Sequence, residues 1–422
     1  MYAIRRKNKG SGFVLSDKAE STLAPVTEQE RIREIDMLRG FALLGVLVVN
    51  TQMFNDTLMS FPVNPFNYAE AMNRWVAVVI QIFATGKFYT MFSFLFGLGF
   101  YIFMERADRK GLNAARLFKR RLLLLLVFGM AHMLLFWYGD ILTSYALTGF
   151  LLLLFRNKSI RSLRNWVIGL LLFSTIFMAG IMTLQVMAEN QMSADQEVLI
   201  SNASALQEVI NIYQEGSYSQ IVSFRLRHEI PMVLISFIFW IPKILGLFLA
   251  GYCAGKLGFF ERLAENKKTI HRMFVWGGAI GWSATVLYLI TSSSLIYESN
   301  YLFIFAGEIA KEVATVSLCL FYMTALLKLH QNGRMDVFLM KFEKVGRLAL
   351  THYITQSVFL TLIFYGYGLG LMHRINLLQG LLISVFIYAV QMLLSPLIIK
   401  QFKTGPMEKL WRKGTYASQI KR

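Results

Sequence analysis

Long apolar runs separated by short polar segments dominate the chain. A helix needs about 20 apolar residues to span a bilayer, and about 17 at the short end. Ten runs meet or approach this length, at residues 38–54, 88–104, 121–138, 140–155, 165–187, 231–254, 271–292, 300–328, 347–371 and 376–400. The apolar run 74–85 is much shorter, which favours a half-helix or interfacial helix. The pattern therefore predicts an all-α, polytopic membrane protein with about ten transmembrane helices and one re-entrant or interfacial helix.

The charge of the loops predicts how these spans are oriented, because Lys and Arg are enriched in cytoplasmic loops. One set of segments carries 35 basic and 12 acidic residues: 1–35, 105–121, 156–164, 255–272, 328–347 and 400–422. The alternate set carries 5 basic and 10 acidic residues: 54–87, 138–140, 188–230, 292–300 and 371–376. This asymmetry predicts cytoplasmic N and C termini and an even number of spans. Counting 74–85 as an eleventh span would place the basic segment 105–121 on the same side of the membrane as the acidic segment 188–230.

These patterns divide the chain into three parts. Residues 1–35 are expected to be a cytoplasmic, disordered segment, because residues 1–30 are polar and mixed in charge. Residues 36–400 form a single transmembrane domain, and its one large outside loop, 188–230, has the pattern of an amphipathic helix on or near the membrane. Residues 401–422 form a basic cytoplasmic tail.

Composition narrows the classes of protein that remain. Hydrophobic residues make up 55% of the chain and charged residues only 16%, which excludes a disordered protein and an ordinary soluble one. Its two cysteines, Cys253 and Cys319, lie in apolar runs and give no disulfide framework. The net charge of +18 lies in the inside loops, so it is explained by membrane orientation and requires no nucleic acid. No cluster has metal-ligand spacing, and no phosphate-binding glycine motif occurs.

Polar residues within the spans are the informative ones, because each is costly at lipid depth unless paired or functional. Arg39 and Asn50 are eleven residues apart, which places them on one helix face and about 16 Å apart along the axis. Arg121 and His132 repeat this spacing. Asp140 follows at the outer turn, where its carboxylate can orient the imidazole of His132. Each helix thus places a cation at its inner end and a polar group deeper in the membrane.

Two further polar groups lie in later spans. Arg347, Thr351 and Thr355 share one face of the ninth span, and His352 and Gln356 share the next. Structural hydrogen bonding between helices explains this stripe as well as a binding role does. A third set, in spans six and eight, has two interpretations, a structural ion network and a proton or substrate path; it comprises Lys243, Glu308, Lys311 and Glu312.

Five segments carry a resemblance to a known family: 36–50 (DMLRGFALLGVLVVN), 87–99 (KFYTMFSFLFGLG), 120–145 (RRLLLLLVFGMAHMLLFWYGDILTSY), 346–357 (GRLALTHYITQS) and 405–416 (GPMEKLWRKGTY). The chain resembles the YeiB-like bacterial membrane proteins, a domain family of unknown function. That family is grouped with transmembrane acyltransferases related to heparan-alpha-glucosaminide N-acetyltransferase. Two positions depart from the pattern. The family often has Asn where His352 stands, and related acyltransferases have His where Asn50 stands, which leaves His132 as the candidate base.

The resemblance implies transfer of an acyl group, most simply acetyl, from cytoplasmic acyl-CoA to an acceptor at the outer face. The acceptor is a glycan, a lipid or a small molecule. We expect the CoA phosphates to bind at Arg39, Arg120, Arg121 and Arg347, because guanidinium binds phosphate bidentately. Along the polar stripe, Thr351 and Gln356 would also contact the donor.

The expected chemistry lies deeper in the membrane. His132 would act as general base or carry the acyl group transiently, with Asp140 holding its tautomer. Asn50 and Tyr145 would donate hydrogen bonds to the developing oxyanion.

Other functions use the same residues differently. In a proton-coupled transporter of a small anionic solute, Lys243, Glu308 and Glu312 would relay protons and the arginines would gate the solute. The absence of internal repeats counts against this interpretation. A non-catalytic membrane partner or sensor is the third alternative. Glycine spacing in several spans permits a homodimer.

Overall fold

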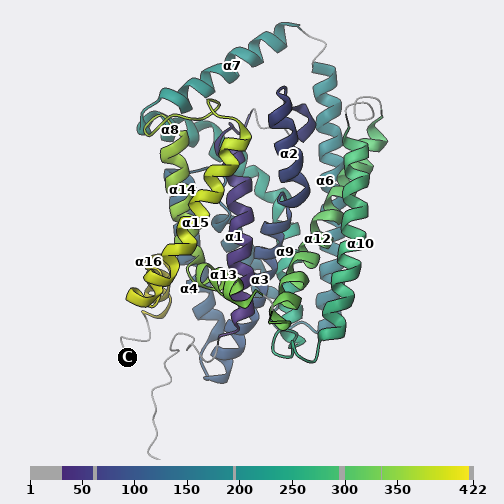
Figure 1. Cartoon of the computed structure of the whole chain (residues 1–422), viewed down its shortest axis with the longest axis vertical. Helices are drawn as coiled ribbons and strands as arrows, with labels where there is room; N and C mark the ends of the chain where they lie inside the picture. Colours follow the sequence, from purple (N-terminus) through teal and green to yellow (C-terminus); the bar gives the residue numbers. More distant parts are fainter. Residues whose placement is uncertain (1–30, 60–63, 193–195, 294–299, 334, 418–422) are drawn as a thin grey trace, which may run out of the picture.

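The computed structural model describes residues 31–59, 64–192, 196–293, 300–333 and 335–417. All regular elements in these ranges are helical, which confirms the all-α part of the predicted fold class (Figure 1). They are α1 (Arg33–Phe54), α2 (Ala71–Phe83), α3 (Lys87–Arg109), α4 (Ala114–Leu135), α5 (Leu142–Leu152), α6 (Ile160–Met192), α7 (Gln196–Glu215), α8 (Tyr218–Phe224), α9 (Ile230–Lys256), α10 (Lys267–Ser292), α12 (Tyr301–Gln331), α13 (Asp336–Arg347), α14 (Ala349–Phe364), α15 (Leu377–Phe402) and α16 (Pro406–Tyr416).

Seven helical stretches among the described residues are long and apolar enough to cross a membrane. They are Arg33–Phe54, Ala71–Arg109, Ile160–Ala188, Tyr218–Lys256, Lys267–Ser292, Tyr301–Gln331 and Leu377–Phe402. The other three predicted spans fall on α4, whose first half is basic, and on α5 and α14, which are shorter apolar helices. The structure thus establishes a membrane-type helical protein, and the count of ten spans stays a prediction.

The short apolar run 74–85 forms a helix of its own. α2 has 13 residues and ends at Phe83, and the chain then turns at Gly86, whose φ of +85° suits glycine. The longer α3 begins at the next residue, Lys87. This stretch is therefore a helix broken within one apolar segment, as its length predicts.

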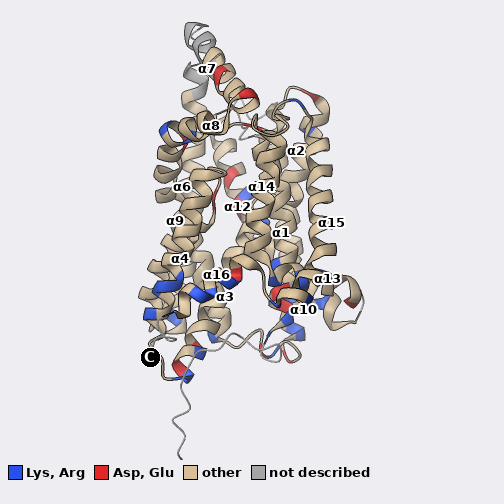
Figure 2. Ribbon diagram, turned by 90° about the vertical axis from the view of Figure 1, so that its left-hand side faces the viewer, with Lys and Arg blue, Asp and Glu red and all other residues tan. Residues whose placement is uncertain are grey.

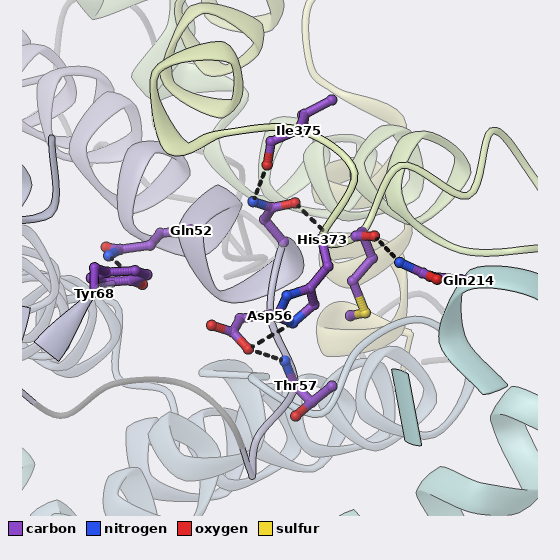
Figure 3. A network of polar contacts seen from close by, with 9 residues as sticks. Gln52, Asp56, Thr57, Tyr68, Gln214, His373 and Ile375 are labelled. Atoms are coloured by element: carbon purple, nitrogen blue, oxygen red, sulfur yellow. Dashed lines mark hydrogen bonds and ion pairs between the residues drawn. The ribbon is translucent and has the colours of Figure 1, made fainter. Parts of the chain in front are cut away.

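The large predicted outside loop, 188–230, is helical where it is described. α7 lies across one end of the bundle (Figure 1). Val209 and Tyr213 are buried, and the backbone N–H of Gly366 donates to the Tyr213 carbonyl at 2.7 Å. Gln214 Nε2 donates to the Met372 carbonyl at 2.6 Å (Figure 3). The loop is therefore fastened to the segment that follows α14.

The same end of the bundle is joined to α1 by a polar network (Figure 3). Asn55 Nδ2 donates to the Ile375 carbonyl at 3.0 Å, and Asn55 Oδ1 accepts from the backbone N–H of His373 at 3.2 Å. His373 Nε2 lies 3.1 Å from Asp56 Oδ1. These contacts fix the end of α1 against the 365–376 segment.

Lys and Arg residues gather at the opposite end of the bundle, where α13, α16 and the C terminus lie (Figure 2). This uneven distribution of Lys and Arg between the two ends is the one that the sequence predicts, with the basic end as the cytoplasmic face. The basic tail is partly structured there, because α16 packs against α4 and α14. Residues 1–30, the predicted disordered segment, lie outside the described residues.

Two hydrophobic cores meet inside the bundle. One is formed mainly by α1, α12, α13, α14 and α15, and the other by α3, α4, α5 and α9. α3 and α9 approach closely through two glycines, each facing a backbone carbonyl of the other helix. A Cβ at Gly97 would overlap the Phe248 oxygen, and a Cβ at Gly251 would overlap the Phe94 oxygen. Small residues at such crossings allow the backbones to touch.

Gly251→Ala is expected to destabilise the protein by about 1–3 kcal/mol, because the added methyl group forces α3 and α9 apart. Thermal unfolding of the purified protein in detergent measures this loss. Gly169→Ala in α6 is the matched control, because no atom lies within 4 Å of its Cβ position. Equal melting temperatures for the two variants would contradict the close α3–α9 contact.

Candidate functional site

A cavity of about 380 Å³ lies where the two hydrophobic cores meet. Residues of α1, α3, α4, α5, α14 and α16 line it, and three phenylalanines, Phe96, Phe100 and Phe118, form part of its wall. Its volume falls in the range of ligand pockets, about 300–1,000 Å³. The cavity therefore has the size and the apolar interior of a small-molecule site.

Arginines dominate the polar part of the lining. They come from both ends of the sequence and are Arg31, Arg39, Arg106, Arg121, Arg347 and Arg412. The acidic lining residues are Asp36 and Glu408. Six cations against two carboxylates leave an excess of four positive charges among the lining residues. Such an arrangement favours an anionic ligand, and guanidinium groups suit phosphate in particular.

Neighbouring side chains hold several of these arginines in place. Asp36 accepts from Arg39 Nη1 at 2.9 Å and from Arg31 Nη1 at 3.2 Å. The Arg121 guanidinium lies 3.8 Å above the Trp411 ring, and Trp411 Nε1 donates to the Arg121 carbonyl at 2.9 Å. α16 is thereby attached to α4 and forms part of the cavity wall. The binding groups are positioned before any ligand arrives.

Two tyrosines line the inner part of the cavity. The Tyr145 hydroxyl lies 2.8 Å from Ser93 Oγ and donates to the Tyr89 carbonyl at 3.1 Å. The Tyr353 hydroxyl accepts from the backbone N–H of Ile141 at 3.3 Å. Both rings are nearly fully buried. These residues set the inner limit of the cavity.

Beyond Tyr353 lies a buried His–Asp pair. The His132 and Tyr353 ring centres are 5.1 Å apart. His132 Nδ1 lies 2.9 Å from Asp140 Oδ1, and Asp140 Oδ2 accepts from the Thr143 backbone N–H at 2.6 Å. A carboxylate on Nδ1 favours the tautomer with its proton there and a free lone pair on Nε2.

That second nitrogen is available for chemistry. His132 is only 2% exposed, and its Nε2 has no hydrogen-bond partner among the described residues. Unpartnered buried polar atoms are uncommon and call for a functional or solvent explanation. An imidazole with an oriented ring and an unpartnered Nε2 has the geometry of a general base.

The structure brings some of the sequence-predicted residues together. Arg39, Arg121, Arg347 and Tyr145 line the cavity, and the His132–Asp140 pair lies behind Tyr353, one of its wall residues. Besides that pair, the predicted residues that do not line it are Asn50, Arg120, Thr351 and Gln356. Asn50 lies one turn before the end of α1 and makes no hydrogen bond to the His132–Asp140 pair.

Two residues of the predicted polar stripe have structural partners. Thr351 Oγ1 donates to Glu408 Oε2, and Glu408 Oε1 accepts the backbone N–H groups of Leu350 and Thr351 at the start of α14. Gln356 Nε2 donates to Gln391 Oε1 at 2.8 Å. Hydrogen bonding between helices therefore accounts for these two side chains, which was one of the two interpretations that the sequence allows.

Several cavity residues were absent from the sequence-predicted site. Tyr353 was overlooked because it lies between the two polar faces of its helix, next to His352. Trp411 and Arg412 lie in the 405–416 motif that carries the family resemblance. That motif was the sequence signal that could have identified them as site residues. Arg31 and Arg106 belong to the segments 1–35 and 105–121, and the basic charge of these segments was explained by membrane orientation alone.

The predicted ion network is present. Lys243 of α9 pairs with Glu312 of α12, and Lys311 pairs with Glu308 on the same helix at 2.5 Å. The pairs fit the structural ion network, which was one of the two interpretations that the sequence allows.

Asp140→Ala is expected to destabilise the protein by about 2–3 kcal/mol, because it leaves His132 Nδ1 and the Thr143 N–H without acceptors in a buried setting. Thermal unfolding in detergent measures the effect. Asp108→Ala removes an exposed ion pair with Arg156 and serves as control, with a change of at most about 1 kcal/mol. An Asp140→Ala variant as stable as the control would contradict the buried pair.

Comparisons with known proteins cover nearly the whole chain. Residues 254–418 match the model of a protein family of unknown function, DUF418. The chain is 34% identical to the uncharacterized protein YxaH of Bacillus subtilis over 416 residues, which cover 94% of this chain and 97% of that protein. It is 31% identical to an uncharacterized 39.9 kDa protein from the amylase 3′ region of Bacillus acidopullulyticus, with 93% and 96% covered.

A third relative is the uncharacterized protein YeiB of Escherichia coli, which is 25% identical over 92% of this chain and 96% of that protein. No solved structure matches the chain. The identity to YxaH along almost the full length of both proteins, together with the match at 254–418, is far beyond what shared membrane composition produces. The chain therefore belongs to the YeiB-like DUF418 family of proteins of unknown function.

Proposed function

We propose that the protein is a membrane-embedded acyltransferase, which moves an acyl group from cytoplasmic acyl-CoA to an acceptor at the outer face of the cell membrane. In this proposal the chain crosses the membrane ten times, with both termini in the cytoplasm. The observation that carries the proposal is the arginine-lined cavity, whose wall includes Tyr353, the residue that packs against the buried His132–Asp140 pair.

The cavity lining suits the two chemically distinct parts of an acyl-CoA. Arg39, Arg121, Arg347 and Arg412 offer donors for its phosphates at the end of the bundle where basic residues gather (Figure 2). The apolar stretch between them and Tyr145 suits the narrow pantetheine arm and a short acyl chain, most simply acetyl. Charge and shape thus favour a thioester directed toward the tyrosines.

His132 supplies the base in the proposed reaction. Its Nε2 takes the proton from an acceptor hydroxyl or amine while that acceptor attacks the thioester carbonyl, and the carbon–sulfur bond breaks to release CoA. Asp140 stabilises the imidazolium that forms. The Tyr145 hydroxyl, which lines the cavity, would donate to the developing oxyanion after releasing the Tyr89 carbonyl to which it now donates.

Tyr353 has a positional role in this scheme. Its ring lies against that of His132, whereas His132 is not part of the cavity lining. We propose that Tyr353 moves when donor and acceptor are both bound, which would keep water from the thioester at other times. The acceptor, a glycan, a lipid or a small molecule, would approach from the end covered by α7.

Arg121→Gln is expected to weaken acetyl-CoA binding by about 10- to 100-fold, because a charge-assisted hydrogen bond contributes about 1.5–3 kcal/mol. Titration of the purified protein with acetyl-CoA measures the dissociation constant. Arg120→Gln is the matched control, because this adjacent arginine does not line the cavity and should leave binding unchanged. Equal weakening in both variants, or no acetyl-CoA binding by the unaltered protein, would overturn the donor assignment.

His132→Ala is expected to abolish transfer of labelled acetyl groups to acceptors outside proteoliposomes, while its affinity for acetyl-CoA stays within a few-fold of the original. The reason is that His132 contributes a base and no part of the cavity lining. Full transfer by this variant would refute the proposed base. Uptake of an anionic solute that depends on Glu308 or Glu312, without acyl transfer, would favour a transporter instead.

A further inference from the structure

The helix α13 carries apolar side chains that the rest of the described chain leaves uncovered. It lies in a segment that the sequence predicts to be a basic inside loop. One side of the helix is buried in the core that α1, α12, α14 and α15 share with it, through Leu339 and Phe342. On the other side Val337 is 80% exposed, and Phe338 and Met340 are 43% exposed each. A helix that meets only water on its outer side would carry polar residues at these positions.

The position of α13 against α1 places this helix at the membrane–water interface. The first turns of α1, Arg33–Arg39, are charged, and an apolar run begins at Gly40. A Cβ at Gly40 would overlap the Phe342 carbonyl, and a Cβ at Gly346 would overlap the Asp36 carbonyl. α13 therefore packs at the level where a membrane-type helix changes from charged to apolar. Figure 2 shows it at the end of the bundle where Lys and Arg residues gather.

Both acidic residues of α13 are engaged within the protein. Asp336 Oδ1 lies 3.1 Å from His330 Nδ1, at the end of α12. Glu343 is within electrostatic reach of Arg33, in the first turn of α1, and of Arg347. The two acids are seven residues apart and so share one side of the helix. The negative charges of α13 thus lie beside the side that carries Val337, and they have partners of their own.

The outer side of α13 combines apolar and basic residues. Val337, Met340, Lys341 and Lys344 are three and four residues apart, so they form one face of the helix, which we call the outer face. Lys341 is exposed, and Lys344 is partly exposed and near Glu343. Lysine stems can cover apolar surface while their ammonium groups reach water or phosphate. An apolar and basic face at the interface is typical of a helix that lies on a membrane surface.

We propose that the outer face of α13 docks on the lipid surface at the basic end of the protein, with a preference for anionic phospholipid. Val337, together with Phe338 at the edge of this face, enters the boundary between headgroups and acyl chains. Lys341 and Lys344 bind the headgroup phosphates. Anionic lipids attract Lys and Arg close to the surface, which selects them over neutral lipids. The basic surroundings of α13 would repel the same surface of a second copy of this chain.

The docking surface is distinct from the arginine-lined cavity, although one helix serves both. Among the residues of α13, only Gly346 and Arg347 line the cavity, so none of the outer face does. Gly346 touches the Asp36 carbonyl, and the Asp36 side chain holds Arg39 at the cavity. Lipid that keeps α13 in place therefore supports the arginine end of the cavity. The proposal does not depend on acyl transfer.

The first test measures thermal unfolding of the full-length protein in nanodiscs of phosphatidylcholine with an increasing fraction of phosphatidylglycerol. The melting temperature should rise with that fraction, because a ligand of the native state stabilises it by mass action. Lys341→Gln combined with Lys344→Gln should lose most of this rise. Lys267→Gln combined with Lys268→Gln is the matched control and should retain it, because it removes two exposed lysines from the start of α10.

The second test measures where the outer face lies. Val337→Cys, in a protein that also carries Cys253→Ala, is labelled with an environment-sensitive fluorophore; the remaining Cys319 is buried. Phospholipids brominated in their acyl chains should quench this label several-fold more than a label at Asn332→Cys, an exposed position directly after α12. The control shares the basic end of the protein but has no place in the outer face.

Three results would overturn the proposal. One is a melting temperature that does not respond to phosphatidylglycerol, or a response that both double variants lose equally. Another is equal quenching of the two labelled positions by brominated lipid. The third is an unquenched label at position 337 together with disulfide-linked dimers of Val337→Cys, which would assign the outer face to a second copy of the chain.

Discussion

The constraint on which this structure depends is that a bilayer offers no hydrogen-bond partners, so each polar group at depth needs a partner within the protein. The protein meets it with specific side-chain contacts. Asp140, in the turn after α4, pairs with His132, Glu312 of α12 pairs with Lys243 of α9, and Glu408 of α16 binds the first N–H groups of α14. The last two contacts each join two helices, so polar residues also help to determine which helices are neighbours.

The same constraint separates structural from functional polar residues. The Thr351 hydroxyl donates to Glu408, and Gln356 Nε2 donates to Gln391, although Gln356 Oε1 has no partner among the described residues. His132 Nε2 has no such partner in the described residues although the other ring nitrogen is held by a carboxylate. The arginines around the cavity outnumber the carboxylates beside them. The unpartnered His132 nitrogen and the excess of arginines over carboxylates thus lie directly behind the cavity and in its wall, which is where chemistry and binding are proposed.

The helical elements followed from the sequence because apolar run length is a strong signal in membrane proteins, and all ten predicted runs fall on helices. The His132–Asp140 pair was also predictable, because Asp140 lies eight residues after His132, in the turn that follows α4. The cavity was not, since it combines α1, α3 and α16, and no local pattern reports which helices pack together. Arg120 and Arg121 are adjacent in sequence, yet only Arg121 faces Trp411 and the cavity, because of how α16 folds back on α4.

The most direct measurement of the central claim is a structure determined in the presence of acetyl-CoA. The account predicts density in the cavity, with the phosphates against Arg39, Arg121 and Arg347 and the thioester near Tyr145 and Tyr353. Density for acetyl-CoA outside the cavity, or a cavity filled by lipid at saturating acetyl-CoA, would contradict it.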